Sequence, residues 1–135
     1  MKRFIVDKKN NTLIVKKDSI VDKHIRFNGK IVAGMYTNFW GNVEADEVYL
    51  GKNCFVGGSI KCKKVVVGAY TKFNSIDAEE VVVLGRCKGS YIKGHNVRIR
   101  EGSVIGAVEA ENFLIIEGSS KLKKMSAKKI IASKP

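Results

Sequence analysis

A sequence repeat of 16–17 residues is the feature that most constrains the fold of this chain. Five consecutive copies share two apolar anchor positions that lie five residues apart, and each anchor recurs after 17, 16, 16 and 16 residues. Because one period holds through five copies, the chain is predicted to be a stack of one repeated unit with a common internal core ladder. The ladder comprises Val43, Val48, Ile60, Val65, Ile76, Val81, Ile92, Val97, Val108 and Phe113.

Each repeat unit has the pattern of short β-strands. Apolar residues within a unit stand two positions apart, as at Val43 and Ala45, which is strand alternation and not helical spacing. A glycine also recurs after the second strand, where we expect it to supply a positive φ at a corner. These glycines are Gly51, Gly68, Gly85, Gly102 and Gly118. The sequence therefore predicts an all-β, single-domain parallel β-helix (β-solenoid) of about six rungs, with 16–17 residues per rung.

The outward positions support parallel, in-register stacking. In such a stack, equivalent residues of neighbouring rungs lie about 4.8 Å apart, so unlike charges attract and like charges repel. The residue between the first two inward positions of each unit changes sign at every step. The series reads Glu44, Lys61, Asp77, Lys93 and Glu109.

We divide the chain into an N-terminal strand, hairpin or cap segment (1–22), the β-helix domain (23–132) and a short tail (133–135). Residues 1–22 hold two apolar runs around an Asn-Asn turn signal, which fits either a hairpin or a first rung. At the other end, Ala127 and Ile130 indicate a partial seventh rung. One rung alone buries too little apolar area to be stable, so stability must come from its neighbours.

Two surfaces are candidates for self-association. Each end of a solenoid leaves an unpaired strand edge, which is a template for a second copy of the chain. The lysine-rich segment 121–134 either blocks this pairing or is a solvated end that leaves the edge free. A second candidate interface comprises Val66, Val82 and Leu114, predicted to point outward, together with Ile130. Alternatively, residues 1–22 fold back over this stripe.

No residue pattern predicts catalysis, a cofactor or a metal. His24 and His95 have no partner at metal-ligand spacing, and the sequence contains no phosphate-binding loop or arguable nucleophile–base pair. We therefore predict that the protein is not an enzyme and uses no cofactor. The three cysteines are odd in number and form no C-x-x-C pair, which favours a reducing compartment.

The chain is strongly basic, with 25 Lys and Arg against 13 Asp and Glu and a net charge of +12. Such a balance promotes weak contact with nucleic acid or an anionic membrane surface, although a surface that is generally rich in lysine explains it equally well.

No apolar run approaches the roughly 18 residues of a membrane span, and the basic N-terminus lacks the apolar core of a signal peptide. We expect a cytoplasmic protein, either free or peripheral on the inner face of the cell membrane.

The repeat resembles that of the bactofilins, the polymer-forming cytoskeletal proteins. Residues 104–115 look like the rung V-x-G-x-V-x-A-x-x-V-x-I, residues 56–67 are a looser copy, and the similarity covers residues 39–132. The resemblance implies a right-handed β-helix that polymerises end to end into non-polar filaments without a nucleotide. Some members attach to membranes through a short N-terminal segment, for which Phe4 and Ile5 are the candidate contacts here.

We therefore predict a self-assembling cytoskeletal scaffold whose main partner is itself, as a homopolymer. The family's filaments serve as scaffolds for cell shape, envelope enzymes or chromosome-partition proteins. The alternative is a non-polymerising basic β-helix module that binds an anionic partner, either nucleic acid or a membrane surface. A hexapeptide-repeat acyltransferase, an enzyme built on a β-helix, is disfavoured because its characteristic rung length is absent.

Overall fold

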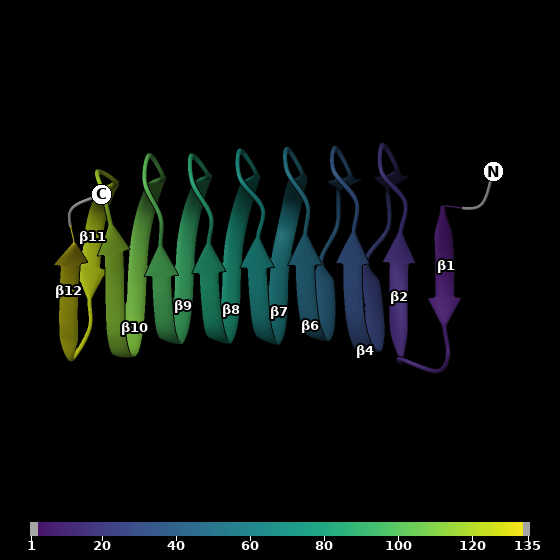
Figure 1. Ribbon diagram of the computed structural model, residues 1–135, viewed down its shortest axis with the longest axis horizontal. Helices are drawn as coiled ribbons and strands as arrows, with labels where there is room; N and C mark the ends of the chain where they lie inside the picture. The colour runs from purple at the N-terminus through teal and green to yellow at the C-terminus, as the bar shows by residue number, and fades with distance from the viewer. Residues whose placement is uncertain (1–2, 134–135) are drawn as a thin grey trace.

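Parallel strands stack turn upon turn along one axis in the computed structural model of the protein, which describes residues 3–133 (Figure 1). They form a β-solenoid, as the repeat predicts, and these residues contain no helix. The solenoid has about seven turns. The strands are β1 (Phe4–Asp7), β2 (Thr12–Val15), β3 (Ile20–Val21), β4 (Ile25–Ala33), β5 (Asn38–Phe39), β6 (Val43–Leu50), β7 (Phe55–Val67), β8 (Lys72–Val83), β9 (Lys88–Ile99), β10 (Val104–Glu117), β11 (Lys121–Ser126) and β12 (Lys129–Ser133).

Each turn contributes to three sheet faces, because the long strands pass from one face to the next at corners. In β7, residues 55–56 pair with β5 on what we call the first face, and residues 60–61 pair with β6 on the second face. Residues 64–67 of the same strand pair with β6 on the third face. The register shifts at corners, as between Val56 and Ser59, and an extra residue there accounts for repeats of unequal length.

The alternating charges lie in register, which confirms the stacking predicted from them. Glu44 is opposite Lys61, and Asp77 is flanked by Lys61 and Lys93. Arg26 extends the column by one turn, and its Nε lies 3.5 Å from Oε2 of Glu44. A second alternating column follows the next corner and comprises Lys30, Glu47, Lys64 and Glu80.

The N-terminal segment contains both structures that the sequence left open. β1 forms an antiparallel hairpin with β2, and its arrow in Figure 1 points opposite to that of β2. β2 and β3 also pair in parallel with β4 and β5, so they belong to a first full turn. This turn raises the count from the predicted six to about seven. β1 continues the sheet edge, so the alternative in which residues 1–22 fold back over the apolar stripe does not hold.

At the C-terminal end, β11 and β12 pair with β10 and form the last turn. This is the partial rung that Ala127 and Ile130 indicated. Ser133, the first residue of the predicted tail, is the last residue of β12. Lys134 and Pro135, the rest of that tail, lie outside the described residues.

The prediction of the internal ladder is wrong at one residue. The first nine residues are 0–2% exposed and stack on one another. Phe113, however, is only half-buried, and Leu114 takes its place opposite Val97 with 0% exposure. The cause is a register shift between Ala110 and Phe113, because a slip of one residue exchanges the two sides of a strand.

The corner glycines only partly behave as predicted. Gly102 and Gly118 have positive φ angles of 79° and 72°, but Gly51, Gly68 and Gly85 do not. Gly68 is needed for close approach instead, because an added Cβ would lie 2.3 Å from the carbonyl oxygen of Gly51. In the middle turns the positive φ falls on a neighbouring residue that is not glycine. These residues are Asn53, Tyr70 and Arg86, with φ of 57°, 63° and 62°.

The corrected register predicts unequal effects for two adjacent substitutions. Leu114→Ala should lower the free energy of unfolding by about 2–5 kcal/mol, because it empties a fully buried position. Phe113→Ala should lower it by less, although it removes a larger side chain, because Phe113 is partly solvated. Urea denaturation of both variants measures the difference, and a larger loss for Phe113→Ala would contradict the register.

Candidate functional site

The C-terminal end of the solenoid exposes the cross-section of its core. Met125 and Ile130 stand in register with the buried residues Val108 and Leu114, so their side chains occupy inward columns. They are nevertheless 45% and 47% exposed, because no further turn covers them. Leu122 occupies a third inward column of this turn and is half-buried. This end is therefore an apolar surface.

The same end also presents unpaired backbone. Within residues 3–133, β11 and β12 each pair with β10 alone, so one side of each strand has no partner (Figure 1). Unpaired N–H and C=O groups on a strand edge favour the addition of another strand. Apolar side chains and an open backbone edge coincide at one end of the molecule.

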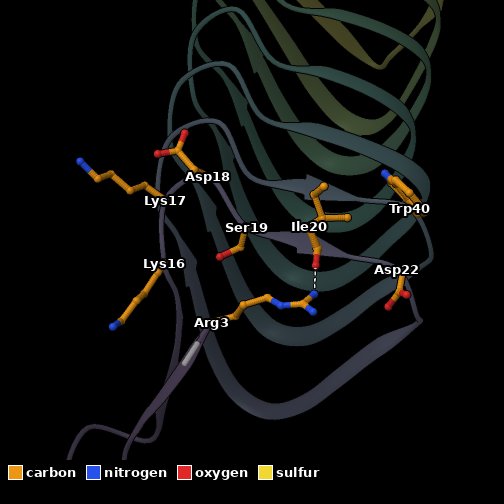
Figure 2. Close-up of a pocket in the computed structure, with 8 residues that line it drawn as sticks. All are labelled: Arg3, Lys16, Lys17, Asp18, Ser19, Ile20, Asp22 and Trp40. Atoms are coloured by element: carbon orange, nitrogen blue, oxygen red, sulfur yellow. Dashed lines mark hydrogen bonds between the residues drawn. The ribbon is translucent and has the colours of Figure 1, made fainter. Parts of the chain in front are cut away.

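The N-terminal end is capped. β1 covers one edge of the first turn, and the backbone N–H of Lys16 donates to the carbonyl oxygen of Arg3 at 2.8 Å. The Arg3 guanidinium donates to the carbonyl oxygen of Ile20 on the exposed edge of β3 (Figure 2). Val15 and Val21 of the first turn are therefore only 0% and 5% exposed. The two ends of the solenoid are thus chemically different.

A hollow of about 650 Å³ lies beside this cap and is open to solvent (Figure 2). Cations and carboxylates both line it, and none of its side chains forms a nucleophile–base pair. Its lining residues are Arg3, Lys16, Lys17, Asp18, Ser19, Ile20, Asp22 and Trp40.

The predicted membrane contacts Phe4 and Ile5 lie on β1, where they are 40% and 45% exposed. Adjacent strand residues point to opposite sides, so the two side chains do not form one patch. Ile5 pairs with Ile14 in an outward column, whereas Phe4 pairs with the inward Val15.

The predicted apolar stripe exists on the third face, but two of its four predicted residues do not belong to it. Val66 and Val82 are half-buried neighbours in an outward column, as predicted. Leu114 is buried, and Ile115 replaces it because of the register shift; Ile130 points inward instead of along the stripe. The full column comprises Ile5, Ile14, Val32, Tyr49, Val66, Val82, Arg98, Ile115 and Ile131.

Two cysteines belong to a buried polar column that the sequence analysis missed. The Cys54 thiol donates to the carbonyl oxygen of Gly34 at 3.3 Å, and the Cys87 thiol donates to that of Gly68 at 3.2 Å. Thr71, between them, separates the two sulfurs. The signal in the sequence was the small polar residue immediately before each first-face strand. The column comprises Thr37, Cys54, Thr71, Cys87 and Ser103.

None of the three thiols is activated. Burial raises the pKa of the Cys54 and Cys87 thiols. Burial, together with the nearby Asp77 and Glu47 carboxylates, raises the pKa of the Cys62 thiol to about 12. Because the thiolate is the nucleophile, these residues are poor candidates for covalent chemistry.

The histidines have structural partners. The Nδ1 atom of His24 accepts the backbone N–H of Asn42 at 2.8 Å, and that of His95 lies 3.5 Å from a Glu111 carboxylate oxygen. Residues 3–133 bring together no group of three or more His, Cys, Asp or Glu side chains that could hold a metal ion. Across this same range, no helix has the length and apolar character that spanning a bilayer requires.

No family model, curated protein or solved structure matches this chain. The assignment of its surfaces therefore depends on geometry and chemistry alone. The two solenoid ends and the apolar stripe are the candidate sites of interaction.

The raised thiol pKa values predict low reactivity. At about pH 8 the folded protein should react with an aromatic disulfide reagent at least about tenfold more slowly than the denatured chain, because little thiolate is present. All three cysteines should titrate once the chain is denatured without reductant. Rapid reaction of any one thiol in the folded protein would contradict this account.

Proposed function

We propose that this protein is a self-assembling cytoskeletal scaffold, similar to bactofilins, whose copies join end to end into filaments without a nucleotide. The observation that carries the proposal is the uncapped C-terminal end, where Met125 and Ile130 are exposed beside the unpaired edges of β11 and β12. A second copy is a natural partner because it presents the same unfinished turn.

Contact between two C-terminal ends would be isologous, since the same surface is buried on both copies. Each fully buried Met, Leu or Ile side chain contributes about 1.5–3 kcal/mol. The edges of β11 and β12 would gain hydrogen bonds at the same time. Apolar burial and new strand pairing would therefore act together at this junction.

A filament needs a second junction, which we assign to the N-terminal end. β1 pairs only with β2 among the described residues, so its outer edge is free. Phe4 and Val6 beside it are 40% and 54% exposed. Alternating C-to-C and N-to-N junctions would give a filament without polarity.

The lysines of the last turn oppose C-to-C contact, because like charges meet across an isologous junction. Salt screens charges that are exposed to solvent, so assembly should increase with ionic strength. Binding to an anionic partner, the alternative function, should decrease with ionic strength. These lysines are Lys121, Lys123, Lys124, Lys128 and Lys129.

The three cysteines are all free thiols. This supports the proposal of a reducing, cytoplasmic location.

Two adjacent isoleucines provide a matched test of the C-terminal junction. Ile130→Asp should abolish long filaments, because it places a charge in the apolar end surface. Ile131→Asp is the control, since Ile131 is similarly exposed at 40% but lies in the outward stripe. Sedimentation and negative-stain electron microscopy, at about 0.05 and 0.5 M salt, measure assembly. A wild-type protein that stays monomeric at every concentration and salt, or equal loss in both variants, would overturn the proposal.

A further inference from the structure

The first face and the corners before and after it carry a set of exposed apolar side chains. Outside the terminal strands β1, β11 and β12, every large apolar residue among residues 3–133 that is at least 38% exposed lies there. Aromatic rings predominate, and Trp40 is 59% exposed. The set comprises Ile20, Met35, Tyr36, Trp40, Phe55, Tyr70 and Val104.

Over four successive turns this surface has no acidic residue, and three of these turns are basic. Asp18 and Asp22 line a hollow with Ile20 and Trp40 at one end of the surface, and Glu101 lies at the other end. The segments of these four turns, residues 34–41, 51–58, 68–74 and 84–90, contain no Asp or Glu. Their charged residues are Lys52, Lys72, Arg86 and Lys88. The acidic residues between positions 43 and 90 all lie on the second face, on the corner after it or at the start of the third face. They are Glu44, Asp46, Glu47, Asp77, Glu79 and Glu80.

These cations are not neutralised within the protein. The ion pairs within 4.0 Å in the described part of the chain involve Arg26, His95, Arg98 and Arg100. Lys72 and Lys88 are instead direct neighbours in register, where like charges repel. The second face satisfies its charges by alternation, whereas the first face leaves them available for a partner.

We propose that the first face docks on an anionic lipid bilayer, with the solenoid axis parallel to the membrane plane. Tryptophan and tyrosine favour the interface between lipid and water, and lysine reaches anionic headgroups. The aliphatic side chains of Ile20, Met35 and Val104 favour lipid over nucleic acid, because they offer apolar burial and no plane for base stacking. This surface is distinct from the N-terminal strand with Phe4 and Ile5.

Docking on this face does not require end-to-end assembly, because one copy carries the whole surface. A filament would present many copies of the face and bind more tightly through avidity. Measurements with the Ile130→Asp variant, whose C-terminal junction is blocked, therefore separate docking from assembly. Filament formation without vesicles tests only the proposed function.

The single tryptophan of the chain is a native reporter for this surface. Vesicles of phosphatidylcholine with phosphatidylglycerol should shift the Trp40 emission to shorter wavelength and protect it from a soluble quencher. Vesicles of phosphatidylcholine alone should do neither. Binding should weaken as salt is raised, because the surface potential is screened.

Two double variants with the same loss of charge distinguish the faces. Lys72→Gln with Lys88→Gln should weaken vesicle binding roughly thirtyfold. Lys61→Gln with Lys93→Gln, on the second face, is the matched control and should have a much smaller effect. Equal effects of the two pairs, or vesicle binding that leaves Trp40 emission unchanged, would overturn the proposal. So would binding of a single-stranded oligonucleotide at a salt concentration where vesicles do not bind.

Discussion

The in-register stacking of successive turns is the constraint on which the rest of this structure depends. Within the stack, each side chain has equivalent neighbours about 4.8 Å above and below it. The side chains of one column must therefore pack against one another without steric clash or charge repulsion. Inward columns meet this condition with β-branched and leucine side chains, and the second face meets it by alternating charge from Arg26 to Glu109. The close backbone approach of Gly51 and Gly68 is the same constraint at a corner.

The constraint also explains why the two ends matter. A residue in the middle of the stack has an equivalent neighbour on both sides, whereas a residue in a terminal turn has one on a single side. At the N-terminus, β1 and the Arg3 side chain replace the missing turn. At the C-terminus nothing in the described chain does so, and Met125 and Ile130 occupy core columns while exposed to water. Our assembly proposal is the completion of these columns by a second copy.

The three faces of the solenoid differ in their charged and apolar side chains. The second face balances its own charges, and the third carries a half-buried apolar stripe that Arg98 interrupts. The first face leaves Lys72 and Lys88 side by side among exposed aromatic rings. A scaffold that lies along a membrane would use the ends for self-contact and the first face for lipid, so the two proposals assign different surfaces to different partners.

The sequence alone determined the all-β coil, the parallel register and most of the internal ladder, because these properties repeat at every turn and a period can be counted. It could not locate the extra residue before Phe113, since a strand converts one inserted residue into an exchange of inside and outside. Nor could it show that residues 12–29 form a turn while β1 caps it, since a hairpin and a first rung both fitted the pattern there. Those features depend on corners and chain ends, where contacts between residues distant in sequence outweigh the local pattern.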